Sequence, residues 1–186
     1  TDEIKEEVLS SLEKSGGQLS VDRSGDLKNK LLQLHWALFD LSRSTHTVLV
    51  SHIATTICAD QDQDQGADNS ASRVAPRLSN YCAYLLAFVP DMLPDHSYTA
   101  TRILDAVILD AREHLGTIKT LSGRCEKMLQ LGKPDSSSNI PVQQDMSILI
   151  LGASLADKLL SENKRPPWKL LAGFWADLVL FLAPSD

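Results

Sequence analysis

The chain has 186 residues and a formal net charge of -6 at pH 7, from 24 acidic and 18 basic residues. This length suits one domain of ordinary size, and the hydrophobic share of 43% and charged share of 23% disfavour wholesale disorder and a multi-span membrane protein. No basic block is longer than Lys164-Arg165, so the electrostatic footprint of a nucleic-acid-binding protein is missing. We therefore expect a single domain, 1–186, that does not bind nucleic acid.

The cysteines and the apolar runs indicate a cytoplasmic domain. The three cysteines are odd in number and widely spaced in apolar stretches, a pattern typical of buried free thiols in a reducing compartment: Cys58, Cys82 and Cys125. The charged first residues do not resemble a secretory signal. The longest apolar run, 168–183, is too short for a membrane span and carries Lys169 and Asp177. Any membrane attachment would then come from segments outside this chain.

The first half of the chain shows helical periodicity. Ile4, Val8 and Leu12 predict a short amphipathic helix that ends at Gly16-Gly17. Asp26 then caps a helix whose apolar stripe consists of Leu27, Leu31, Leu34, Leu38 and Leu41. This stripe lasts only two heptads, which favours burial in the protein's own core over a coiled coil.

The segment 47–58 is rich in β-branched residues, which favour a strand locally. We nevertheless predict a helix, because the chain offers no second strand to pair with it and helical neighbours override propensity. A further helix over 72–89, ended by Pro90, should bury the residues at helical spacing: Val74, Leu78, Tyr81, Cys82, Leu85 and Val89.

Four more helical segments follow, over 97–116, 118–132, 141–160 and 167–182. Ser97 or Thr99 should cap the first of them, whose inward face would be Ile103, Leu104, Val107, Ile108, Ala111 and Leu115. The last should bury a broad apolar face made of Leu171, Phe174, Trp175, Leu178 and Leu182. The sequence thus predicts an all-α, single-domain orthogonal bundle of about seven or eight helices.

Two polar segments are predicted to be mobile loops, an acidic one at 60–71 and a Ser-rich one at 132–140. In the acidic loop Asp60, Asp62 and Asp64 alternate as the first ligands of a calcium loop do. The sixth position, however, is Gln65 instead of Gly, and the twelfth is Ala71 instead of Glu. We expect no metal here, and a calcium-responsive module remains an alternative.

No motif for catalysis or for a cofactor emerges, and we expect neither. The five histidines form no zinc-binding spacing, and the glycines form no phosphate-binding loop. His52 lies in an apolar helical segment with Cys58 six residues later, so it is either a core histidine satisfied locally or part of an unrecognised enzyme site. The absence of any nucleophile signature around Cys58 favours the core histidine.

Several short stretches, in fixed order from Val48 onward, resemble one plant family. They are His52-Ile53-Ala54-Thr55, Leu78-Ser79-Asn80-Tyr81 with Tyr84-Leu85-Leu86, Leu155-Ala156-Asp157-Lys158-Leu159-Leu160, and Trp168 through Phe174-Trp175-Ala176-Asp177 to Ala183-Pro184-Ser185-Asp186. The chain is similar to the C-terminal cytosolic region of the grass-rich plant membrane proteins that carry paired domains of unknown function. It departs from that family at Ser51, where members commonly have Trp, and at Thr56, where they have an acidic residue.

The resemblance implies a helical domain on the cytosolic side of a membrane, with no assigned reaction. Taken with the missing motifs, it leads us to expect a non-catalytic protein-interaction or regulatory domain with a protein partner. Family members usually continue past the position of Asp186 into another helix. If that helix normally packs on the segment 168–182, its absence here should leave an apolar strip exposed. Val179 and Phe181 are then the partner-binding candidates, for self-association or for a helical partner.

Overall fold

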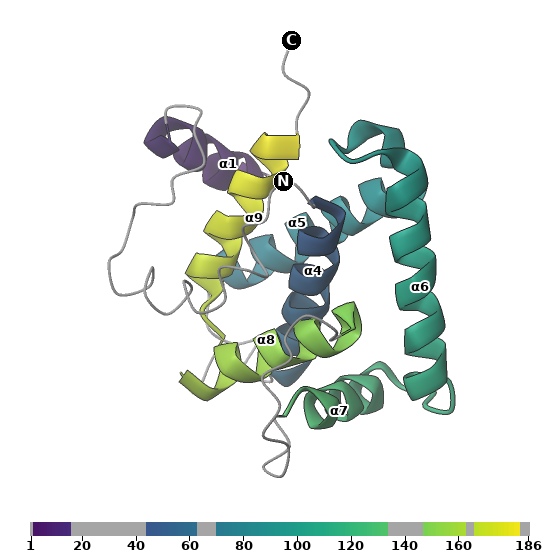
Figure 1. Cartoon of the computed structure of the whole chain (residues 1–186). Coiled ribbons are helices and arrows are strands. Elements are labelled where there is room, and N and C mark those ends of the chain that lie inside the picture. Colours follow the sequence, from purple (N-terminus) through teal and green to yellow (C-terminus); the bar gives the residue numbers. More distant parts are fainter. Residues whose placement is uncertain (1, 16–43, 63–69, 134–146, 163–165, 183–186) are drawn as a thin grey trace, which may run out of the picture.

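The computed structural model describes residues 2–15, 44–62, 70–133, 147–162 and 166–182 (Figure 1). Helices make up 88% of these residues, and no strand occurs among them. The elements are α1 (Asp2–Ser15), α4 (Ser44–Gln61), α5 (Ser70–Phe88), the 3-10 helix η2 (Pro90–Met92), α6 (Ser97–Leu115), α7 (Leu121–Gly132), α8 (Ile148–Glu162) and α9 (Trp168–Leu182). They pack against one another as an all-α bundle, which confirms the predicted fold class.

Helix α4 is the centre of the bundle. It packs against α5, α6, α7 and α8, and α8 crosses it at a steep angle (Figure 1). Helices α9 and α1 pack together and cover α5, while α6 stands at the opposite edge of the bundle. In the described part of the chain, α4 is therefore surrounded by most of the other helices.

The central position of α4 explains why a β-branched segment is helical. Its buried residues occur on every side: Ser44, Thr45, Thr47, Val48, Leu49, Val50, Ser51, Ala54, Thr55, Ile57 and Cys58. A helix that is apolar all round is stable when other helices enclose it, and tertiary packing then outweighs the local preference for a strand. The structure therefore confirms the helix predicted over 47–58.

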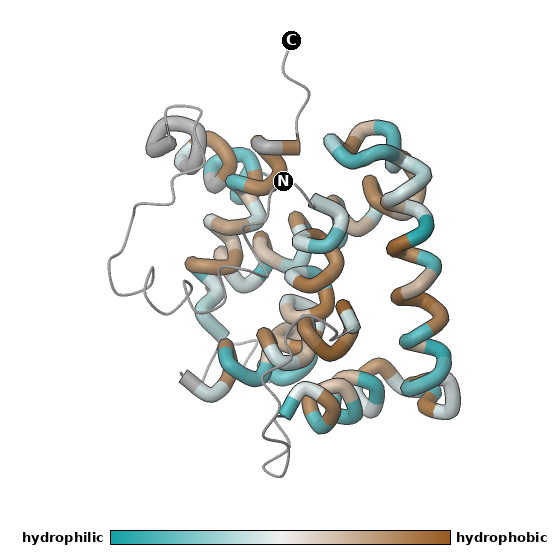
Figure 2. Tube along the Cα trace, in the orientation of Figure 1, coloured by the Kyte–Doolittle hydropathy of each residue, from teal (hydrophilic) through white to brown (hydrophobic). Residues whose placement is uncertain are grey.

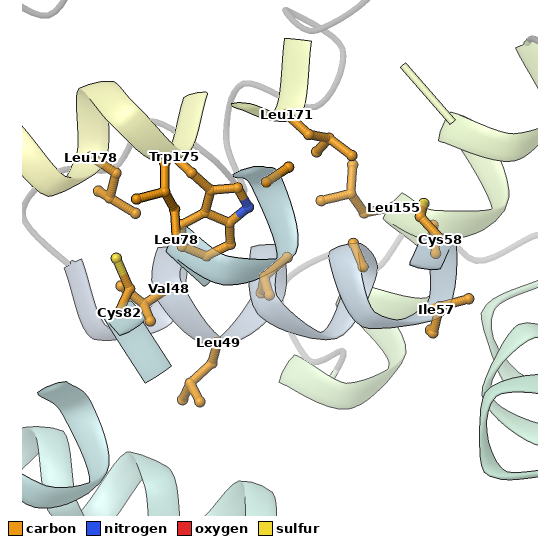
Figure 3. Close-up of a cluster of buried hydrophobic side chains, with 14 of the residues drawn as sticks. Val48, Leu49, Ile57, Cys58, Leu78, Cys82, Leu155, Leu171, Trp175 and Leu178 are labelled. Carbon is orange, nitrogen blue, oxygen red and sulfur yellow. The ribbon is translucent and has the colours of Figure 1, made fainter. Parts of the chain in front are cut away.

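The hydrophobic core joins α4 to α5, α8 and α9 (Figure 3). Trp175 of α9 is fully buried and lies beside Leu78 of α5 and Leu178 of its own helix. All five residues predicted for the inward face of α9 are buried or half-buried. The spacing of apolar residues along α9 therefore predicted its buried face correctly.

Two glycines allow α8 to approach its neighbours closely. A Cβ atom on Gly152 of α8 would lie 2.7 Å from the side chain of Ile53 in α4. A Cβ atom on Gly132, the last residue of α7, would lie 2.6 Å from the backbone of Ala153 and Ser154 in α8. Contacts this short leave no room for a side chain, so the α4–α8 and α7–α8 packing depends on glycine at these positions.

Helix α6 is buried much less than the sequence predicts. Only Ala100 and Leu115 of its 19 residues are buried, and Ile108, predicted to face inward, is 38% exposed. Ile103, Leu104, Val107 and Ala111 are half-buried against the core. Figure 2 shows hydrophobic and hydrophilic residues alternating along this helix, as expected for a helix that packs on one side only.

The cap of α6 differs from the sequence prediction. His96 occupies the N-cap position and makes no side-chain cap hydrogen bond, while Ser97 and Thr99 lie within the helix. Helix α7, by contrast, starts with a Thr120 cap whose Oγ1 accepts a hydrogen bond from the Gly123 amide at 3.2 Å. The cap predicted at Ser97 or Thr99 is therefore wrong, because the chain enters the helix one residue earlier.

Other predicted segments fall partly or wholly outside the described residues. The Leu-striped helix predicted after Asp26 lies there, and so does most of the acidic loop predicted at 60–71. Helix α4 includes Asp60 and Gln61, and α5 already begins at Ser70, so helices take up both ends of that loop. The Ser-rich loop predicted at 132–140 is described only at Gly132, which ends α7, and at Lys133.

Within the described ranges, no helix combines the length and apolarity needed to cross a membrane.

Candidate functional site

His52 and Ser79 form a hydrogen bond between α4 and α5. The His52 Nδ1 atom lies 2.9 Å from the Ser79 hydroxyl oxygen. Ser79 is only 1% exposed, and the His52 ring is half-buried. Burial lowers the pKa of His52 below its ordinary value, which keeps the imidazole neutral at physiological pH. The pair therefore joins two core helices through a neutral hydrogen bond.

The serine–histidine pair and the cysteines do not offer an accessible nucleophile. A serine nucleophile must contact its substrate, and the buried Ser79 hydroxyl is closed to solvent. All three thiols are buried and free, and burial raises the pKa of Cys58 and of Cys82 to about 12 and that of Cys125 to about 11. Thiols with such pKa values stay protonated and unreactive at neutral pH. These residues therefore supply no reactive group to support the alternative of an enzyme site around His52.

Two aspartates of the acidic segment have structural partners. Asp60 accepts a hydrogen bond from the Ser122 hydroxyl of α7 at 3.0 Å, and Asp62 accepts one from the Trp168 indole at 2.6 Å. These contacts attach the end of α4 to α7 and α9. No group of three or more His, Cys, Asp or Glu side chains that could hold a metal ion occurs among the described residues. Asp64 lies outside them.

Asp95 binds the beginning of α4 from a distant loop. Its Oδ2 atom accepts hydrogen bonds from both the amide and the hydroxyl of Thr45, each at 2.6 Å. Burial alone would raise the pKa of Asp95, but hydrogen bonds from the first turn of α4 outweigh burial and lower the pKa below its ordinary value. A carboxylate here satisfies free amides and interacts favourably with the helix dipole. The interaction fixes the η2–α6 connection against α4.

Of the two partner-binding residues predicted on α9, only Val179 has a described side chain. Val179 is half-buried and packs against the hydrophobic core. The side chain of Phe181 lies outside the described residues. Among the side chains that the structure describes, the large exposed apolar ones are Leu9, Tyr81, Tyr84, Phe88, Met92, Tyr98, Ile108, Leu109 and Leu121.

Four of these exposed residues follow one another along α5 and η2, and we call them the α5 strip: Tyr81, Tyr84, Phe88 and Met92. Their exposed fractions are 49%, 53%, 72% and 49%. The Tyr84 and Phe88 rings contact each other, with centroids 5.0 Å apart and planes inclined at 33°. Three neighbouring aromatic side chains at the surface, one of them almost three-quarters exposed, make this the strongest candidate for an interaction surface.

The α5 strip lies to one side of the buried face of the same helix. Val74, Leu78, Cys82 and Leu86 are buried, and Tyr81 lies at the edge of the face that they form, about 20° around the helix axis from Val74 and about 100° from Cys82. Helix α1 covers the beginning of α5, where Arg73 pairs with Glu3. Tyr81 was wrongly predicted to be buried, since it is 49% exposed. The spacing of the aromatic residues 81, 84 and 88 indicates that they share one face of a helix. Spacing alone does not tell whether that face is buried or exposed.

Comparisons with known proteins do not identify a relative: no family model, curated protein or solved structure matches the chain.

Proposed function

We propose that the chain is a non-catalytic helical protein-interaction or regulatory domain and that the α5 strip is its binding surface. The observation that carries this proposal is the exposure of three neighbouring aromatic side chains, with Phe88 at 72%. Rigid aromatic residues supply large contact areas at small entropic cost, and they dominate binding energy at protein interfaces. Exposed aromatic side chains do not stabilise the isolated domain. We therefore assign to them the role of binding a partner that covers them.

The reactive groups support a binding role over a catalytic one. Ser79 and the three cysteines are buried, and the His52 ring is bound to Ser79. As part of the same proposal, the domain belongs to the cytosolic part of a plant membrane protein, anchored by segments outside this chain. The support for this context is the resemblance of the segments around His52, Tyr81 and Trp175 to that plant family.

Photo-crosslinking in plant cells tests the binding surface. The photoreactive amino acid benzoylphenylalanine would replace Phe88 in one variant and Leu109 in a matched control. Leu109 is 63% exposed on α6, outside the α5 strip. We expect a covalent protein adduct from position 88 and none from position 109. Equal adducts from both positions, or none from position 88, would contradict the proposal.

Protease protection tests the cellular context separately. In sealed membrane vesicles from plant tissue, an antibody against this chain should detect a membrane-bound protein. Protease added outside cytosol-side-out vesicles should then remove the epitope. A protein found only in the soluble fraction, or an epitope protected inside the vesicles, would contradict the membrane-tethered cytosolic placement. Neither result would test the proposed binding surface.

A further inference from the structure

We infer that the partner of the α5 strip is a second copy of this chain, which pairs with the first through an antiparallel α5–α5 contact centred on Tyr84. This inference rests on the proposed function, since it names the partner of the same surface. Two features support it: the spacing of the aromatic residues on this face of α5, and the opposite charges that precede them on α5 and follow them in η2.

The spacing gives α5 one continuous outer face. Arg77, Tyr81, Tyr84 and Phe88 follow one another at intervals of four, three and four residues. At about 100° of rotation per residue, these four side chains lie within about 60° of one another around the helix axis. Intervals of four and three are also the pattern through which two helices interlock side chains. The α5 strip is therefore shaped to pack against another helix along its length.

The charges at the ends of this face complement each other when two copies are antiparallel. Exposed Arg77 precedes the aromatic residues, and exposed Asp91 in η2 follows them. Arg77 and Asp91 each lie seven residues from Tyr84. In an antiparallel contact with two-fold symmetry centred near Tyr84, the Arg77 end of each α5 therefore lies beside the end of the other copy from which η2 and its Asp91 follow, and Tyr81 lies near Phe88 of the other copy. A parallel arrangement would instead place like charges together.

The other charged residues near the strip fit the same arrangement. Arg73, one turn before Arg77, pairs with Glu3 of α1. Asp95 is bound to Thr45 at the start of α4. Arg77 and Asp91 are then the charged side chains next to the aromatic residues at the two ends. Antiparallel helices also align their dipoles favourably.

The size of the surface predicts weak association. One helix face with four large side chains is smaller than the roughly 800 Å² per partner of a standard stable interface. We therefore expect a monomer–dimer equilibrium with a dissociation constant on the order of 0.1 mM, in the range of transient contacts. Such an equilibrium suits a domain concentrated on a membrane, where the local concentration of copies is high.

Sedimentation of the purified chain from about 1 µM to about 1 mM tests the inference, because this range brackets the expected dissociation constant. We expect the wild type to shift from monomer to dimer. Phe88→Ser should weaken the dimer by at least about tenfold. Leu109→Ser, an equally polar change at an exposed residue outside the strip, should leave the dissociation constant unchanged. Circular dichroism would confirm that each variant keeps the wild-type helix content.

Charge reversal tests the antiparallel register. Arg77→Glu alone and Asp91→Arg alone should each weaken the dimer by about tenfold, because each creates two contacts between like charges. The double variant carries both changes in every copy and should restore the wild-type dissociation constant. A dimer that the single changes leave intact, or that the double variant fails to restore, would overturn the proposed pairing.

A wild type that stays monomeric up to about 1 mM, or a dimer unaffected by Phe88→Ser, would overturn the second copy as the partner. The cellular crosslink separates this failure from failure of the proposed function. An adduct at position 88 whose mass differs from twice the chain would mean that the α5 strip binds a different protein. No adduct at position 88 would contradict the binding surface itself.

Discussion

The indole nitrogen of Trp175 donates a hydrogen bond to the Thr55 hydroxyl oxygen at 3.0 Å, joining α9 to α4 across 120 residues of chain. The Thr55 hydroxyl in turn donates to the Ser51 carbonyl oxygen of its own helix at 2.8 Å. Both side chains are almost fully buried. A large indole thus enters the core with its one polar group satisfied, as burial of a tryptophan requires.

This relationship predicts how the core responds to mutation. Trp175→Ala should lower the free energy of unfolding by about 3–5 kcal/mol, enough to make a domain of this size molten or insoluble. Thr55→Val keeps the shape but leaves the buried indole donor unsatisfied, so it should cost about 1–3 kcal/mol. In the Trp175→Phe background the donor is gone, and Thr55→Val should cost less. Urea unfolding of the two single variants and the double variant measures this coupling. Strictly additive costs would show that the hydrogen bond contributes nothing.

Two helical glycines should respond oppositely to the same substitution. Gly152→Ala should lower the free energy of unfolding by about 1–3 kcal/mol, because its Cβ would meet Ile53 at 2.7 Å. A Cβ atom on Gly173 in α9 would have no neighbouring atom within 4 Å, so Gly173→Ala should raise the free energy of unfolding by about 0.5–1 kcal/mol through helix propensity. Thermal unfolding of both variants checks the difference. Equal effects would mean that α8 and α4 are not as close as described.

Asp95 should make the fold sensitive to acid. Its folded-state pKa is lowered, so its contribution to stability is complete above its ordinary pKa of about 3.9 and is lost as the pH falls through the folded value. At neutral pH, Asp95→Ala should cost about 1–2 kcal/mol, because it removes both hydrogen bonds to Thr45. Urea unfolding from pH 3 to 7 measures both effects. Exposed Asp105 of α6 gives the control, and Asp105→Ala should leave the unfolding curve nearly unchanged.

His52 should produce a second pH effect at higher pH. Burial lowers its folded-state pKa, so the unfolded chain takes up a proton at about pH 6.5 while the folded chain resists protonation. The stabilising contribution of neutral His52 is therefore present above about pH 6.5 and is lost as the pH falls toward the folded value. His52→Gln should flatten the decline of stability between pH 7 and pH 5. A variant whose stability falls as steeply as that of the wild type would show that His52 does not titrate differently on folding.

The three cysteines should be unreactive in the folded protein. Their thiols are buried, and their pKa values are raised to about 12 for Cys58 and Cys82 and about 11 for Cys125. A thiol reagent such as Ellman's reagent at pH 7.5 should therefore label none of them until denaturant is added, after which all three should react. Rapid labelling of a folded, cooperatively unfolding sample would show that a thiol is accessible. That result would support the alternative of an enzyme site around His52.

The sequence by itself determined the helices and most of their inward faces. Periodicity at three and four residues identified α1, α5, α6 and α9, and the lack of any partner strand correctly predicted that α4 is helical in spite of its β-branched residues. The buried face of α9, with Trp175 at its centre, followed from spacing alone. These features are local, because a helix and its apolar stripe are set by residues a few positions apart.

Only the tertiary structure decided which apolar faces are covered and which polar groups meet. Tyr81 has the same spacing as a core residue, yet it is 49% exposed in the folded chain. The contacts of Asp95 with Thr45, of His52 with Ser79 and of Trp175 with Thr55 join segments far apart in the chain. Spacing within one helix records how apolar a face is. Whether that face is buried depends on distant segments that the pattern does not contain.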